Sequence, residues 1–380
     1  MTTAGYFKLD LKPGAFPALD GLRALAILLV LARHAATALP SPDAGLAPPL
    51  RWLYNLALNG WLGVDLFFVL SGCLIATHLL RWQQFSTHPY RFKTYLLKRI
   101  CRTFPLYYAI IALILLGLVP YYQADPVSSF DLLVLLLFVQ DYFGAQLLVP
   151  LWSLAVEEKF YLLAPGLIFG LYRYVRPRQA IALLLLLSLL PPALRMAALT
   201  TPPDDYADFF WRVRAPFSLE ALLFGVLCAL LTPHLAARDF VRRHQRALMW
   251  TGTALLVVLL CARPWAETGD WTVCALLIYA AAALFGCLVY LAIAAPRAQS
   301  GVLAGAPLRV ISKLSYALYL THYTMIPAAA RAAGALVGAA SGIMYGTAFL
   351  LCYLVFSFAF SVLLHFIVEK PFLLLKERFR

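Results

Sequence analysis

The stretch that decides the fold runs from Asp20 to His34 and reads DGLRALAILLVLARH. It is mostly apolar, with Arg23 near its start and His34 at its end. Apolar runs of about 20 residues, long enough to cross a ~30 Å hydrocarbon layer as a helix, recur along the rest of the chain. We therefore expect an all-α, polytopic membrane protein, in which Arg23 and His34 are hard to explain as packing.

Composition supports a membrane protein and argues against other classes. The 380 residues are 63% hydrophobic and 13% charged, whereas soluble domains are about 45–50% apolar. The mean hydropathy is +0.80. The net charge of +13 does not indicate nucleic acid, because the basic residues lie in alternating loops, as expected beside an anionic cytoplasmic leaflet. The seven cysteines are scattered and form no C-x-x-C, so neither a disulfide framework nor a metal site is expected.

About ten transmembrane helices are predicted. Their approximate ranges are 20–39, 58–80, 103–120, 151–173, 180–199, 215–232, 246–262, 271–294, 308–330 and 342–368. Basic loops, such as those near Arg173 and Arg243, should be cytoplasmic, and the acidic loops between them should face outward. Both termini are then cytoplasmic: an N-terminal segment, 1–19, without a removable signal peptide, and a basic tail, 373–380.

The apolar run from Leu132 to Val139 does not fit this alternation as a further crossing. Two crossings already separate the basic loop at Lys98 from the one at Arg173, and a third would invert everything downstream. We expect Asp131 to Pro150 to form a re-entrant or interfacial element on the outer side.

Ionisable residues inside the predicted helices are candidate functional groups, because a charge at a helix centre is disfavoured by roughly 2.5–3.5 kcal/mol on insertion scales. At 1.5 Å per residue, His34 lies about 21 Å from the cytoplasmic start of its helix, hence about 9 Å below the outer face. Asp65, Glu157, Glu158 and His322 fall at a similar depth. Ionisable groups from four helices on one level favour a shared site over independent packing roles.

Structural roles stay open for several of these residues. Asp65, beside Gly63, would also suit a helix cap. Glu158 would suit pairing with a nearby basic group, and His322 a hydrogen bond between helices. Trp152 has the character of an interfacial anchor.

A second, mostly basic level lies near the cytoplasmic face and includes Arg23, Arg99 and Arg102. The positive-inside bias alone would place Arg99 and Arg102 there, so they fit anion binding and topology equally. Arg23 and His34 are eleven residues apart, about 1100° of helical rotation, so both project from nearly one face. This suits a molecule with an anionic portion inside and a reactive group reaching outward.

Six stretches occur in one order: DGLRALAILLVLARH, GWLGVDLFFVLSG, RICRTFPLYY, LWSLAVEEKFYLLAP, SKLSYALYLTH and VEKPF. Together they resemble the membrane acyltransferase-3 family, and the resemblance covers a membrane domain over 20–372. It implies about ten transmembrane helices and transfer of an acyl group, usually acetyl from cytoplasmic acetyl-CoA, to a sugar hydroxyl. The family's motifs fall on Arg23 with His34, on Arg99 with Arg102, and on Glu157 with Tyr161.

The resemblance implies a division of roles among the candidate residues. Arg23, Arg99 and Arg102 would hold the phosphates of coenzyme A. His34 would act as general base or accept the acyl group, and Glu157 or Asp65 would orient it. The residues expected to bind the acceptor are Trp152, Ser153, Glu158, Tyr161, Tyr319 and His322.

The expected setting is the bacterial cytoplasmic (inner) membrane, with acetyl-CoA as co-substrate and no metal. The expected partners are the lipid bilayer, a carbohydrate acceptor and envelope polysaccharide assembly proteins, without nucleic acid. Because only Leu373 to Arg380 follow the membrane domain, we expect it to recognise its acceptor itself or with a partner. The acceptor stays open among exopolysaccharide, lipopolysaccharide, peptidoglycan, a lipid-linked sugar and a macrolide. The alternative function is a transporter or flippase for a small anion or lipid-linked sugar.

Overall fold

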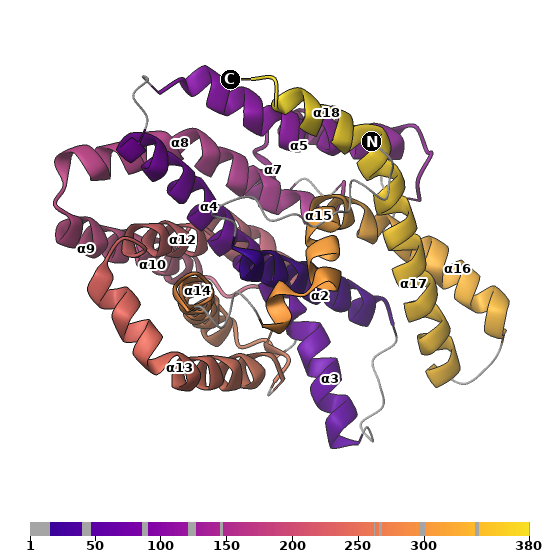
Figure 1. Cartoon of the computed structure of the whole chain (residues 1–380). Coiled ribbons are helices and arrows are strands. Elements are labelled where there is room, and N and C mark those ends of the chain that lie inside the picture. Colours follow the sequence, from indigo (N-terminus) through magenta and orange to yellow (C-terminus); the bar gives the residue numbers. More distant parts are fainter. Residues whose placement is uncertain are drawn as a thin grey trace. The chain divides into compact units, whose positions relative to one another are not determined.

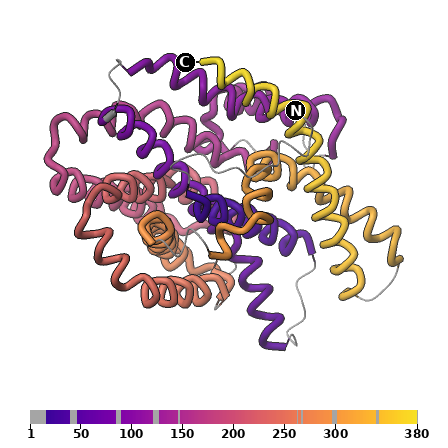
Figure 2. Tube along the Cα trace, in the orientation of Figure 1, coloured from indigo at the N-terminus to yellow at the C-terminus, as the bar shows by residue number. Residues whose placement is uncertain are grey.

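The computed structural model is helical throughout the part of the chain that it describes, with no strand there (Figure 1). The described residues are 16–39, 47–85, 90–120, 127–144, 147–261, 263–265, 268–295, 301–338 and 342–379. Most of the predicted N-terminal segment 1–19 lies outside them, as does the last residue of the tail. The trace in Figure 2 shows one helix following another along the sequence.

The chain divides into two compact units. Unit 1 consists of residues 1–30, 47–88 and 163–313, and unit 2 of residues 31–46, 89–162 and 314–380. The division falls within three helices: α2 (Pro17–Ala38), α8 (Trp152–Tyr174) and α15 (Ala306–Thr321).

Unit 1 is organised around the close contact of α4 (Gly63–Phe85) and α12 (Glu220–Leu231). A Cβ atom on Gly72 would lie 2.1 Å from the Leu222 carbonyl oxygen, and one on Gly225 would lie 2.2 Å from the Val69 carbonyl oxygen. The two backbones approach this closely because neither glycine has a side chain. The other helices of this unit are α3 (Pro48–Leu58), α9 (Pro177–Ser188), α10 (Leu190–Ala198), α11 (Tyr206–Asp208), α13 (Leu235–Cys261) and α14 (Trp271–Ala294).

Unit 2 contains α5 (Phe92–Leu115), α6 (Ser129–Leu136), α7 (Gln140–Phe143), α16 (Ile326–Val337), α17 (Gly342–Leu364) and α18 (Lys370–Lys376). In Figure 1, α16 runs beside α17 and α18 runs beside α5. The core of the unit is apolar and includes Leu106, Ile110, Leu135, Leu151 and Leu320. This core joins α5 to α6, to the start of α8 and to α15.

The predicted outer element, Asp131 to Pro150, consists of α6, α7 and a short 3-10 helix at its end, apart from two residues that are not described. α6 has eight residues, about 12 Å of helix, and is too short to cross a bilayer. Gln140 donates from Nε2 to the Leu151 carbonyl at 2.8 Å, and Asp141 pairs with Lys159 of α8. Burial raises the pKa of the Asp141 carboxyl, and its hydrogen bond with Lys159 opposes that rise. These contacts hold the element against α8.

Among the described residues, six stretches are long and apolar enough to cross a membrane. They are Pro17–Ala38, Pro48–Gln84, Pro177–Ala198, Tyr206–Leu231, Trp271–Ala294 and Gly342–Lys376. The number of ten and the cytoplasmic location of both termini stay predictions.

Several helix boundaries differ from those expected. α5 begins at Phe92, so Arg99 and Arg102 lie on a helix and not in a loop before it. α13 begins at Leu235, ahead of the predicted start at 246, because its charged first turns are also helical. The stretch expected at 308–330 breaks at a 3-10 helix, His322–Met325, before α16 begins with Pro327 in its first turn, where a missing N–H costs no helical hydrogen bond.

Candidate functional site

Two histidines of unit 2 lie against each other. His34, near the end of α2, is half-buried, and the centroid of its ring lies 5.1 Å from that of His322. The Tyr323 ring meets His34 edge-on at 4.9 Å. The break between α15 and α16 places His322 and Tyr323 on a short 3-10 helix, from which both rings contact His34.

The protonation of His322 is set by the end of α15. Its Nδ1 lies 2.8 Å from the Leu318 carbonyl oxygen, which belongs to the last turn of the helix, where carbonyls lack helical donors. A carbonyl only accepts, so Nδ1 carries the hydrogen and Nε2 presents its lone pair. The side chain is 0% exposed, and Nε2 has no hydrogen-bond partner among the described residues. A buried acceptor without a partner costs about 1–3 kcal/mol, which suggests a functional reason for it.

Next to this pair, Ser153 and Tyr319 join the first turn of α8 to α15. Their hydroxyl oxygens are 2.6 Å apart, and the Tyr319 ring centroid lies 6.1 Å from that of His322. Trp152 is buried at 3% exposure, so in this structure it packs within the protein. The predicted acceptor residues Ser153, Tyr319 and His322 are thus neighbours.

The acidic motif of α8 faces hydroxyl groups. Tyr161 donates its hydroxyl to Glu157 Oε2 at 2.9 Å, and Thr103 donates to Glu158 Oε1 at 2.6 Å. The Arg99 guanidinium lies 5.6 Å from the ring centroid of Tyr161, on the side of the ring face. The structure therefore brings Arg99 of α5 together with the predicted residues of α8.

α8 and α15 carry polar side chains of both groups of contacts in unit 2. Tyr316 and Tyr319 of α15 and Tyr323 of the following 3-10 helix recur at spacings of three and four along the chain. Tyr316 donates its hydroxyl to the carbonyl of Thr103 at 2.5 Å, at the end nearer Arg99 and the half-buried Arg102. Tyr323, seven residues further along the chain, contacts His34.

Asp65 has a different environment, in unit 1. Arg214 donates from Nη2 to Asp65 Oδ2 at 2.9 Å, and its guanidinium lies 4.0 Å from the centroid of the Trp61 ring. Both side chains are at most 2% exposed. A second pair, Arg195 with Glu220 at 2.5 Å, is equally buried in this unit. The structure thus gives Asp65 a buried ion pair, the partner that a charge at this depth requires.

Arg23 also belongs to unit 1. It lines a cavity of about 290 Å³ between α2 and α4. Arg99 and Arg102 belong to unit 2.

Comparison with known sequences places the chain in a family. A family described as "Acyltransferase domain", acyltransferase-3, matches residues 16–366. The chain belongs to the acyltransferase-3 family.

Curated relatives of this acyltransferase-3 chain include three bacterial proteins. The peptidoglycan O-acetyltransferase OatA of Listeria monocytogenes is 28% identical over 334 residues, 82% of this chain and 49% of that protein. The O-acetyltransferase OatA of Staphylococcus aureus is 28% identical over 336 residues, 83% and 51% of the two chains. The putative peptidoglycan O-acetyltransferase YrhL of Bacillus subtilis is 29% identical over 335 residues, 82% and 48%. The chain spans about half the length of these relatives, and no solved structure matches it.

Several residues of the acyltransferase-3 domain escaped the sequence reasoning. Arg195, Arg214 and Glu220 carry charges in or beside predicted membrane helices, so the insertion penalty that singled out Asp65 also applied to them. Tyr323 and Thr103 carry no charge and gave no signal. Tyr323 contacts His34 and Thr103 binds Glu158 only because the fold brings their helices together.

Proposed function

We propose that this chain is a multi-pass membrane O-acyltransferase of the bacterial inner membrane. It transfers an acetyl group from cytoplasmic acyl-CoA to a hydroxyl of a cell-envelope carbohydrate, through a bundle of about ten crossings with both termini in the cytoplasm. Membership of the family supports acyl transfer, and the names of the relatives support acetyl as the group and a peptidoglycan saccharide as the first acceptor to test.

The observation that carries this proposal is the contact of His34 with a buried imidazole of fixed tautomer. His322 holds its proton on Nδ1 and presents an unprotonated Nε2, while the His34 ring lies 5.1 Å away. Such a pair suits a reaction in which one proton leaves a hydroxyl and returns to a leaving group.

In the proposed reaction, His34 takes the proton of the acceptor hydroxyl. The hydroxyl oxygen attacks the thioester carbonyl carbon, the C–S bond breaks, and the thiolate of coenzyme A receives the proton from the His34 imidazolium. Arg23, Arg99 and Arg102 hold the anionic donor. Asp65 already has Arg214 as its partner, so Glu157 is the better candidate for orienting His34.

We assign acceptor recognition to the side chains beside His322 and along the first turns of α8. Ser153 and Tyr319 offer hydroxyls beside His322, and Trp152 lies in the same turn as Ser153. Sugar hydroxyls bind to such mixtures of hydroxyl, imidazole and aromatic groups. Glu158 and Tyr161 extend the polar wall along α8.

The test uses the full chain in lipid nanodiscs with labelled acetyl-CoA and a peptidoglycan oligosaccharide. We expect free CoA and acetylated sugar in equal amounts. Substitution His34→Ala should lower kcat by about 10²–10⁴-fold, the usual contribution of a general base. His244→Ala, at an exposed histidine of α13, is the matched control and should keep full activity.

Two outcomes would change the proposal. Movement of the sugar across the membrane without any acetylated product would overturn it in favour of a flippase. An acetyl group trapped on His34 in the absence of acceptor would replace the general-base role with a covalent one.

A further inference from the structure

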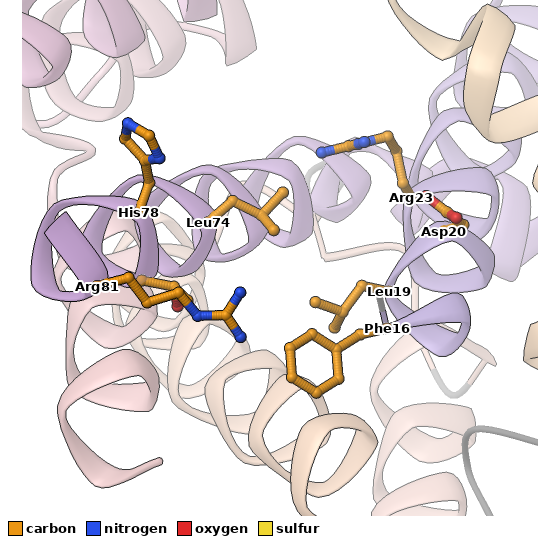
Figure 3. Close-up of a pocket in the computed structure, with 8 residues that line it drawn as sticks. Phe16, Leu19, Asp20, Arg23, Leu74, His78 and Arg81 are labelled. Atoms are coloured by element: carbon orange, nitrogen blue, oxygen red, sulfur yellow. The ribbon is translucent and has the colours of Figure 1, made fainter. Parts of the chain in front are cut away.

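The cavity at Arg23 brings together basic groups from two helices of unit 1. Arg23 projects from α2, while His78 and Arg81 project from α4 (Figure 3). Figure 3 shows the guanidinium groups of both arginines directed into the space between the helices. The helix predicted over 58–80 includes His78 and ends just before Arg81, whereas in the structure both residues lie on α4 and line one wall of the cavity.

Helical spacing explains the wall on each side. Leu74, His78 and Arg81 recur on α4 at spacings of four and three, and Leu19 and Arg23 are four apart on α2. Each helix thus turns one stripe toward the cavity. Leu19 and Leu74 of these stripes, together with Phe16, form the apolar part of the lining, and Figure 3 shows Phe16 and Leu19 beside Arg81.

The charge of the lining favours an anion. The lining contains two guanidinium groups and one carboxylate, that of Asp20. Ser312 donates its hydroxyl to this carboxylate at 3.3 Å. Arg81 is exposed and Arg23 is half-buried, so an anion can reach both from outside the protein. Guanidinium forks match phosphate oxygens in geometry, which makes a phosphorylated ligand the best fit.

The volume of the cavity and its aromatic side chain restrict the class of ligand further. A cavity of about 290 Å³ lies near the lower end of the roughly 300–1,000 Å³ of small-molecule sites, enough for a nucleoside-sized group. Phe16 offers a ring on which a base can stack. A phosphorylated nucleoside therefore fits both the basic and the apolar residues of the lining.

We propose that this cavity binds the phosphorylated nucleoside end of the acyl-CoA donor, with Arg81 as the ligand of its 3′-phosphate. The inference rests on the proposed function and adds the α4 wall to the donor site. The pyrophosphate, which is joined directly to the pantetheine arm, pairs with Arg23, because α2 continues from Arg23 toward His34. The 3′-phosphate, at the far end of the donor, pairs with Arg81 on α4.

The test measures binding of CoA and of dephospho-CoA, which lacks the 3′-phosphate, to the full chain in nanodiscs of zwitterionic lipid. The wild type should bind CoA more tightly than dephospho-CoA. Arg81→Gln should weaken CoA binding roughly 10- to 100-fold, as expected for a lost charge-assisted contact, and leave dephospho-CoA nearly unchanged. Arg243→Gln, at another exposed arginine, is the control and should change neither.

The remaining outcomes separate the possible failures. If Arg81→Gln weakens both ligands equally, or neither, the assignment of the 3′-phosphate is wrong. A lipid headgroup shares the phosphate chemistry, so the measurements are repeated with phosphatidylglycerol nanodiscs. If Arg81→Gln removes only an effect of that lipid, the cavity is a lipid site and the proposal falls. If the wild type binds no CoA but still modifies sugar, the donor in the proposed function is wrong.

Discussion

We expect the loss of the Asp65 carboxylate to lower the stability of the fold and not to remove a catalytic group. In Asp65→Ala the Arg214 guanidinium, whose side chain is 1% exposed, loses its countercharge but keeps its position beside Trp61. Breaking a buried pair by removing one partner costs about 3–5 kcal/mol, because a charge is left in a low-dielectric interior. We expect Asp65→Ala and Arg214→Ala to lower the free energy of unfolding by similar amounts.

The double variant Asp65→Leu with Arg214→Met separates loss of a pair from loss of a catalytic group. Two apolar side chains of similar size should recover most of the stability, and also the activity if Asp65 has only a structural role. Unfolding in mixed micelles can be followed with a thiol-reactive dye at buried Cys73, with Asp239→Ala, at an exposed acid, as control. A fully stable Asp65→Ala protein whose kcat has fallen a hundredfold would refute this reasoning.

Two further predictions concern packing and acceptor binding. Gly72→Ala should lower both the melting temperature and the amount of folded protein, because its Cβ would lie 2.1 Å from a backbone oxygen of α12. Gly170→Ala is the control and should be neutral or stabilising, because there is open space around Gly170. Equal behaviour of the two variants would contradict the close contact of α4 and α12. Tyr319→Phe should remove the hydroxyl contact with Ser153, cost about 1 kcal/mol of stability and raise the KM for the sugar, measured by steady-state kinetics. An unchanged KM would remove Tyr319 from the acceptor site.

The sequence predicted the candidate residues of the site, but not all of their contacts. Helix-rise arithmetic put His34, His322 and Asp65 at one level, and the rings of the two histidines are in contact. Asp65 instead pairs with Arg214, because depth along a helix does not specify the helix that its side chain faces. The helical class and most long helices follow from hydropathy alone.

Elements with charged or mixed composition were harder to predict. The α3 helix and the first turns of α13 are amphipathic or basic, so a search for apolar runs left them in loops. The cavity at Arg23 needed Arg81, which is 58 positions away in the sequence. No local pattern encodes such a pairing, because it depends on how α2 and α4 pack.

The buried pairs of unit 1 also impose an order on biosynthesis. Asp65 precedes its partner by 149 residues and Arg195 precedes Glu220 by 25. At about 5–20 residues per second, Asp65 is synthesised roughly 7–30 s before Arg214, and Arg195 roughly 1–5 s before Glu220. Both pairs are then completed within a few residues of each other. A nascent chain interrupted before Arg214 would carry a carboxyl without its partner in its second long helix, which disfavours insertion of that helix.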